Sequence, residues 1–291
     1  MTARPTIIAS KTFTYTVLAL IAFAANSVLC RLALGTDTID APSFTAIRLL
    51  SGIITLFLIL QLRNNNKSPG SKGSWVSGGM LFLYAVTFSY AYITLDTATG
   101  ALILFGTVQL TMIMVSLYSG QKLHFTEWLG VFMAFAGFVY LVLPGITTPS
   151  VTGFLLMTVA GIAWGFYTLN GRGSMDPLAD TFWNFYRTLP LVIVLVIITV
   201  QNSSLSSEGV LLAILSGAVA SGMGYAIWYS ALKGLSITQA AVVQLAVPVI
   251  AAFGGVLFVN EAISLRLILS AAMILGGILL VILGRNYFKQ A

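Results

Sequence analysis

The sequence predicts an all-α membrane protein with ten transmembrane helices, arranged as two inverted five-helix repeats. Three observations lead to this fold class. Of the 291 residues, 58% are hydrophobic and only 8% are charged, whereas soluble domains carry about 25% charged residues. The apolar residues fall into runs of about 20, the length that crosses a bilayer as a helix. The second half of the chain also repeats the pattern of the first.

Ten apolar runs follow one another, separated by short polar connections. We expect a transmembrane helix in each, and the longest polar stretch, RNNNKSPGSKGS at 63–74, has the composition of a loop. The predicted spans are 14–34, 42–62, 75–95, 98–118, 126–144, 152–170, 179–200, 209–231, 238–259 and 264–284. We therefore expect one integral membrane unit.

The first run has some features of a secretory signal, since Arg4 and Lys11 precede it and FAAN looks like a cleavage site. The apolar stretch continues to about Leu34, however, which is longer than the apolar part of a signal peptide. We therefore expect an uncleaved first helix. The lone Cys30 cannot form an internal disulfide, and we expect it to be buried.

The basic residues predict the orientation of the spans. With the N-terminus inside, 10 of the 14 Lys and Arg residues lie in cytoplasmic segments, and the loops at 145–151 and 201–208 contain none. We expect a multi-pass protein of the cell inner membrane with both termini in the cytoplasm. The net charge of +6 then favours anionic lipid as a partner, and no nucleic acid. The ten are Arg4, Lys11, Arg63, Lys67, Lys72, Lys122, Arg172, Lys233, Arg285 and Lys289.

An internal repeat emerges when the chain is shifted by about 135–140 residues against itself. YAYITLDTATGALILFGTVQL (90–110) then aligns with YAIWYSALKGLSITQAAVVQL (225–245) without a gap. Because each half has five spans, an odd number, the second half (146–291) would enter the membrane from the side opposite to the first (1–145). Inverted repeats are typical of secondary transporters, whose sites lie near the midplane. The aligned pairs are Tyr90 with Tyr225, Gln109 with Gln244, Arg48 with Arg187, and Gly137 with Gly277.

Motifs in the second half resemble those of a known family. AAVVQLAVPVIAAFGGVLFVNEAIS (240–264) contains Pro248 and Glu261, and a last span with Gly276 and Gly277 follows it. This arrangement resembles the drug/metabolite transporter superfamily and its EamA-type ten-helix members. AWGFYTLNGRG at 163–173 resembles the opening of their sixth helix. The length and YSGQK at 118–122 resemble the YddG-type exporters of aromatic amino acids. The first half departs from the pattern, since Gln121 stands where the second half has Glu261.

The resemblance implies export of amino acids, with aromatic and other apolar ones favoured, and of related small metabolites, by alternating access. Polar and aromatic residues near span centres suit a small zwitterion, because amides bind its ends and rings attract its ammonium. Each of these residues could instead hold two neighbouring helices together by a hydrogen bond. The predicted substrate-binding residues are Asn26, Tyr84, Tyr90, Gln109, Trp164, Tyr225 and Gln244, and Ser221 lies at a comparable depth.

Pro248 is the predicted hinge. It cannot donate a hydrogen bond to the carbonyl of Gln244, so another group or a water-filled cavity must satisfy that oxygen. We expect Gln109 and Gln244 to line the central site from opposite halves. The fourth span has no matching proline, so bending should differ between the halves.

Arg48 and Arg187 are the two charged residues that lie deep within predicted spans. Inserting an arginine at the centre of a membrane helix costs about 2.5–3.5 kcal/mol of free energy. Either could bind a substrate carboxylate, or could snorkel and cap carbonyls. Their equivalent placement in the repeat favours a structural role, because a single substrate needs only one.

The remaining ionisable residues argue against other functions. The eight acids lie in loops or at span ends, and His124 lies in a connection, so we expect no proton-coupled pump for cationic drugs. Too few deep cations are present for a sugar-phosphate, the other alternative cargo. An intramembrane enzyme would need a catalytic or metal cluster. We expect no enzyme activity, cofactor or metal, and a monomer; proton-coupled and facilitated transport both fit. The acids are Asp37, Asp40, Asp96, Glu127, Asp176, Asp180, Glu208 and Glu261.

Overall fold

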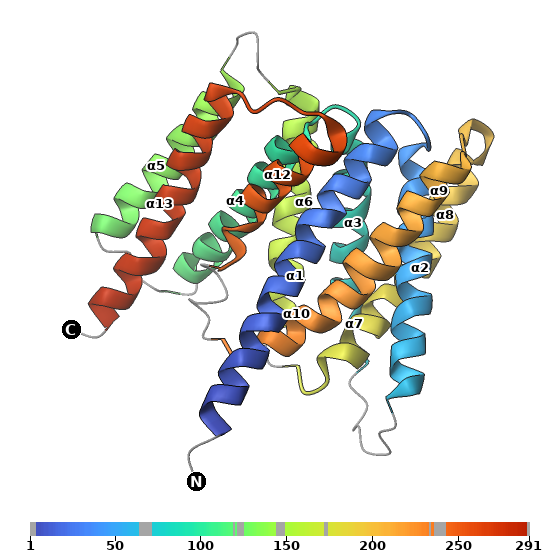
Figure 1. The fold of residues 1–291 in the computed structure, drawn as a ribbon, viewed down its shortest axis with the longest axis horizontal. Coiled ribbons are helices and arrows are strands. Elements are labelled where there is room, and N and C mark those ends of the chain that lie inside the picture. Colours follow the sequence, from blue (N-terminus) through green and yellow to red (C-terminus); the bar gives the residue numbers. More distant parts are fainter. Residues whose placement is uncertain are drawn as a thin grey trace.

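The structure is a computed structural model, and it describes residues 4–63, 72–118, 120, 125–143, 149–171, 174–232, 234–235 and 243–289. Across these residues helices occupy all ten predicted spans and form one upright bundle, with both termini toward its lower end in Figure 1. We call this the terminal end. The opposite, distal end carries the connections at 36–40, 93–96, 200–206 and 260–264. The predicted fold class, an all-α membrane protein, is confirmed.

The first half comprises five continuous helices. Short polar residues explain where some of them begin, because a side-chain oxygen there accepts a bond from an otherwise unsatisfied backbone N–H. Asp40 accepts from the N–H of Ser43, at 2.9 Å, and Ser74 accepts from that of Ser77, at 3.0 Å. The helices are α1 (Arg4–Gly35), α2 (Ala41–Leu62), α3 (Trp75–Tyr92), α4 (Thr97–Tyr118) and α5 (Phe125–Val142).

The second half has more, shorter elements. Ser150, Asp176 and Ser206 cap three of its helices in the same way. The sixth span is α6 (Val151–Asn170), and the seventh is α7 (Pro177–Tyr186) with α8 (Leu189–Thr199), followed by η1 (Val200–Asn202). The eighth is α9 (Ser207–Leu215), η2 (Ser216–Met223) and α10 (Gly224–Leu232). The ninth ends as α12 (Val247–Val259), and the tenth is α13 (Leu265–Lys289).

Prolines and glycines explain the interruptions. Pro190 cannot donate to the carbonyl of Tyr186, and the seventh span is broken just before it, at 187–188. The eighth span widens into a π-helix, η2, over a stretch that includes Gly217. The ninth turns at 245–246, immediately before α12, and Pro248 is in the first turn of that helix.

The break at Pro248 fits the predicted difference between the halves, because α4 is continuous from Thr97 to Tyr118. Whether this position moves as a hinge stays a prediction.

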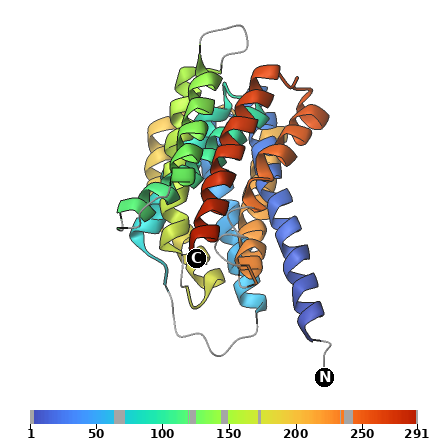
Figure 2. The same cartoon turned by 90° about the vertical axis from the view of Figure 1, so that its left-hand side faces the viewer.

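The helices pair as a two-fold relation between the halves would require. α6 packs on α3 and α4, and its counterpart α1 packs on α10 and α12. α4 also contacts α12, and α5 contacts α13. The last pair stands at one side of the bundle, and Figure 2, seen from that side, shows its two helices side by side. The predicted boundary between the halves, at residues 145 and 146, lies outside the described residues.

Small residues let α5 and α13 approach closely, as is common between membrane helices. A Cβ on Gly277 would lie 2.7 Å from the backbone nitrogen of Ala134 and would overlap the carbonyl of Gly130. Much of the outer surface is apolar, including Phe132 and Phe135 on α5. Six helical stretches of the described residues are long and apolar enough to cross a membrane, and α5, α12 and α13 contain shorter apolar stretches.

Candidate functional site

Four of the seven predicted binding residues line one cavity. Asn26 comes from α1, Tyr84 from α3, Trp164 from α6 and Tyr225 from α10. The cavity measures about 10 Å³, roughly the room that one water molecule needs. This conformation is therefore closed, and any molecule larger than water would enter only after the walls move apart. The other lining residues are Phe23, Ser27, Phe88, Leu104 and Phe105.

Trp164 is the centre of an aromatic cluster around this cavity. Its ring centroid lies 4.9 Å from those of both Tyr84 and Tyr225, and 5.2 Å from that of Tyr167. Phe23 meets it edge-on at 6.4 Å. Rings at these separations attract one another beyond their hydrophobic burial. The cluster is thus a cohesive apolar wall that could close on an apolar side chain.

A chain of hydrogen bonds forms the polar side of the same cavity. Arg48 donates from Nη2 to the Tyr84 hydroxyl at 3.1 Å and from Nε to Ser221 Oγ at 3.2 Å. Asn26 Nδ2 donates to the same Tyr84 oxygen at 3.3 Å, and Ser216 donates to Asn26 Oδ1 at 2.6 Å. The network therefore joins four elements, α1, α2, α3 and η2, and two of its donors meet at the hydroxyl of Tyr84, whose side chain lines the cavity.

The π-helix η2 supplies both serines of this network. A π-helical turn is rare and is often found at functional sites. Ser221 was noted in the sequence, whereas Ser216 was missed. The glycine-rich surroundings of Ser216, SGAVASGMG at 216–224, were the available signal.

The other predicted site residues lie elsewhere. Tyr90 is 36% exposed on α3 and does not line the cavity, although its repeat partner Tyr225 does. Gln109 and Gln244 are buried, at 3% and 5% exposure, but neither lines the cavity in this closed conformation. A role for the two amides stays a prediction, and we leave Tyr90 out of the proposed site.

Arg48 and Arg187 differ in their surroundings despite their alignment. The Arg187 guanidinium donates from Nη1 to the carbonyls of Lys72 and, at 3.1 Å, of Trp183, and it lies 5.6 Å from the centre of the Trp75 ring. These are the contacts of a snorkelling arginine. Arg48 is 2% exposed and contacts the central network. The expected equivalence fails because the seventh span breaks at 187–188.

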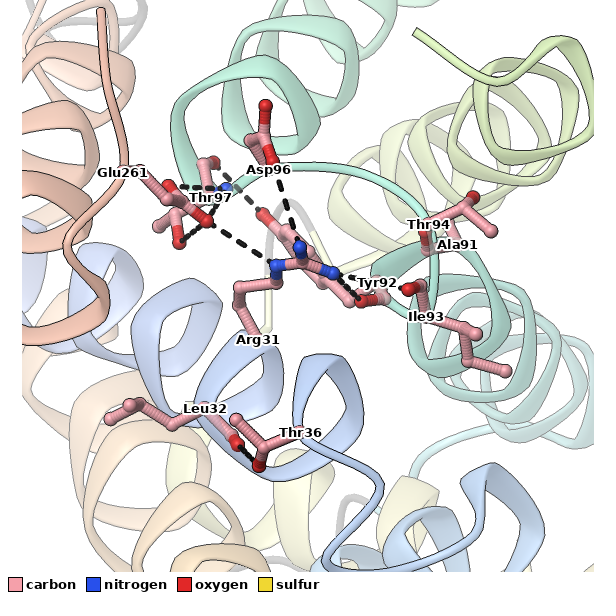
Figure 3. A network of polar contacts seen from close by, with 10 residues as sticks. All are labelled: Arg31, Leu32, Thr36, Ala91, Tyr92, Ile93, Thr94, Asp96, Thr97 and Glu261. Carbon is pink, nitrogen blue, oxygen red and sulfur yellow. Dashed lines mark hydrogen bonds and ion pairs between the residues drawn. The ribbon is translucent and has the colours of Figure 1, made fainter.

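A second polar cluster joins three segments at the distal end, and we call Arg31, Asp96, Thr97 and Glu261 the distal latch (Figure 3). Arg31 on α1 pairs with Glu261 at 3.3 Å and with Asp96 at 3.6 Å. Its Nη1 also donates to the carbonyls of Tyr92 and Ile93, at 3.0 and 3.1 Å. One arginine thus ties α1 to the ends of α3 and α12.

Glu261 also caps α4. Both of its oxygens lie 2.9 Å from the backbone nitrogen of Thr97, and Thr97 Oγ1 donates to Oε1 at 3.1 Å. A carboxylate is favoured at a helix N-terminus because the helix dipole is positive there. Burial nevertheless raises the pKa of Glu261 above its ordinary value, outweighing the bonds from Thr97 and the charge of Arg31 that lower it. The aligned Gln121 lies outside the described residues.

A larger pocket, of about 320 Å³, opens beside the latch. Asp96 and Glu261 line it, together with Thr99 on α4 and Ser264 ahead of α13. Among the described residues, no group of three or more His, Cys, Asp or Glu side chains is placed to hold a metal ion.

Comparison with known proteins agrees with this architecture. Two segments, 10–143 and 151–283, each match the EamA-like transporter family. An uncharacterized protein from Pseudomonas aeruginosa is 47% identical over 94% of this chain and 96% of its own. An uncharacterized transporter from Archaeoglobus fulgidus is 25% identical over 87% and 90%, and the uncharacterized transporter YoaV from Bacillus subtilis is 21% identical over 84% and 88%.

One crystal structure, of a protein 20% identical in sequence, superposes with a TM-score of 0.62 over 94% of this chain and 99% of its own. At that identity it supports the fold alone. The family match covers one five-helix half at a time, as the internal repeat and the paired packing of the helices lead one to expect. The chain therefore belongs to the EamA-like transporter family of the drug/metabolite transporter superfamily.

Proposed function

We propose that this membrane transporter exports amino acids, mainly aromatic and other apolar ones, and related small metabolites, by alternating access. The observation that carries the proposal is a cavity with one aromatic wall and one polar wall. Phe23, Trp164 and Tyr225 would pack on an apolar side chain, and Asn26 and Tyr84 would bind the polar end of the substrate. A preference for aromatic substrates of the YddG type is part of this proposal.

Alternating access assigns a role to each end of the bundle. With both termini in the cytoplasm, the distal latch would face outward, and it is closed here while the central cavity is small. Substrate would bind after the terminal end opens and would leave after the latch opens. The helices of one chain suffice to line the central cavity, so we propose a monomer that works without a cofactor.

Reconstitution tests the proposal. We expect purified protein in liposomes to exchange labelled phenylalanine and leucine down a substrate gradient without an imposed pH gradient, because no carboxylate lines the central cavity among the described residues. A cationic drug and a sugar-phosphate complete the panel and represent the alternative cargo. Transport of only those two compounds, or strict dependence on a proton gradient, would contradict the proposal.

The distal latch should respond to pH in a definite direction. Burial raises the pKa of Glu261 in the latched state, whereas an opened latch would expose the carboxyl and return it toward about 4.3. The latched state then binds the proton more tightly, so protonation favours it. As pH falls from neutrality toward that ordinary value, the latched fraction should rise.

Pulsed electron spin resonance can measure this shift as a distance between labels at Ala262→Cys and Ser203→Cys, on two distal connections. Glu261→Gln should remove the pH dependence, whereas Glu208→Gln, a change on α9 away from the latch, should keep it. A latched fraction that falls on acidification would mean that the ion pair with Arg31 outweighs burial.

A further inference from the structure

We propose that Arg48 is the anchor for the carboxylate of the substrate, so that this transporter selects monocarboxylates with an apolar body. The inference deepens the proposed function and rests on it. It starts from an unmet hydrogen-bonding need: Arg48 is 2% exposed, and its Nη1 is buried without a hydrogen-bond partner among the described residues.

Arg48 also has no counterion among the described residues. All eight acids of the chain lie in the described part of the structure, and none of them pairs with it. Most have partners of their own, and the surroundings of Arg48 consist of neutral hydroxyls, a thiol and aromatic rings. An uncompensated buried charge is costly, and arginines within membranes mark substrate pathways or find partners. The acids with partners include Asp40 with Ser43, Asp96 and Glu261 with Arg31, Asp176 with Arg63, and Asp180 with Gly73.

The position of Arg48 suits a ligand that enters the central cavity. Its guanidinium carbon lies 5.2 Å from the centre of the Tyr84 ring and 4.9 Å from that of the Phe88 ring, and both rings line the cavity. Nε is held by Ser221 and Nη2 by Tyr84, which aligns the fork and leaves Nη1 available. When the cavity opens and these two rings move aside, a carboxylate can accept from Nη1 and Nη2 together, the bidentate geometry that guanidinium favours.

The same geometry restricts the ligand. Arg48 lies behind Tyr84 and Phe88, and no Lys or Arg lines the cavity itself among the described residues. This single cation would balance the single charge of a carboxylate, whereas a phosphate dianion would be left partly unbalanced. The aromatic wall provides the site for an apolar body. Arg187 also has one buried nitrogen without a partner among the described residues, Nε, but its guanidinium donates to carbonyls and lies over the ring of Trp75, which does not line the cavity.

Three ligands that differ by one group separate the possibilities. Phenylalanine has a carboxylate and an ammonium, 3-phenylpropanoate has only the carboxylate, and phenylalaninamide has only the ammonium. Binding to purified full-length protein can be followed by intrinsic tryptophan fluorescence. We expect the wild type to bind phenylalaninamide about tenfold or more weakly than phenylalanine, because one charge-assisted pair is lost.

Variants of Arg48 test whether this residue causes the preference for phenylalanine over phenylalaninamide. Arg48→Gln should bring phenylalanine and phenylalaninamide to within about twofold of each other, as expected when the charged partner is removed. Arg48→Lys should restore part of the difference, since the charge remains without the fork. Arg187→Gln is the matched control and should keep the wild-type preference.

The outcomes are distinct. A wild type that binds the amide as tightly as the acid overturns the inference even if Arg48→Gln fails to fold, and so does an Arg48→Gln protein that keeps the preference. If liposomes transport no amino acid while 3-phenylpropanoate still binds in an Arg48-dependent way, the proposed function fails and the carboxylate site stands.

Discussion

Trp164→Ala should lower the transport of every aromatic and apolar amino acid at least about a hundredfold. The indole contacts Tyr84 and Tyr225 at centroid separations of 4.9 Å, so its loss removes the surface that connects the two walls of the cavity. Truncation of a buried aromatic also costs about 3–5 kcal/mol of stability. Initial rates in liposomes, normalised to reconstituted protein, measure the first effect, and the melting temperature measures the second.

Two variants separate recognition from stability in this experiment. Trp164→Phe keeps a ring at the position, so it should recover most of the stability and part of the transport. Trp128→Ala removes a tryptophan that is 45% exposed on α5 and should leave both measurements unchanged. Normal transport by a folded Trp164→Ala protein would mean that the aromatic cluster only packs the helices.

Gly217→Ala should destabilise the protein strongly although it adds one methyl group. A Cβ at Gly217 would overlap the carbonyl oxygen of Arg48 and the hydroxyl of Ser51, and would lie 2.8 Å from the Arg48 carbonyl carbon. Backbone atoms of α2 cannot yield as a flexible side chain can, so η2 and α2 must separate. Overpacking of this kind costs about 1–3 kcal/mol and sometimes more.

The separation of α2 from η2 also reaches the site. It would stretch the bond that Arg48 on α2 donates to Ser221 on η2, so both the substrate affinity and the melting temperature should fall. Gly79→Ala on α3 is the control, because a Cβ there meets nothing within 4 Å, and alanine favours the helix. If the Gly217→Ala and Gly79→Ala proteins have the same melting temperature, α2 and η2 are less tightly packed than the structure indicates.

Repeat alignment placed residues at equivalent depths, but it did not establish which face of a helix they occupy. Tyr90 and Tyr225 align without a gap, and only Tyr225 lines the cavity. Tyr84, six residues before Tyr90 on α3, takes the place at the centre instead. Side chains six positions apart point in different directions around a helix with 3.6 residues per turn. Depth therefore followed from the sequence, and direction required the packed bundle.

The two arginines show the same limit. Their alignment favoured one shared structural role, yet Arg187 reaches carbonyls near Trp75 and Arg48 is enclosed beside the cavity. The cause is the break at 187–188 in the seventh span, which has no counterpart in α2. Pro190 was visible in the sequence, but its effect on the placement of Arg187 depended on the position of α3.

The sequence by itself determined that the chain crosses a membrane as ten helices, because that result is local. Each apolar run is long enough to span the bilayer, and its backbone groups must be satisfied within the run. Only the tertiary structure decided which polar residues meet. The bonds from Arg48 to Tyr84 and from Ser216 to Asn26 join residues 36 and 190 positions apart. They depend on how the packed helices are rotated and interrupted, and no single span encodes that.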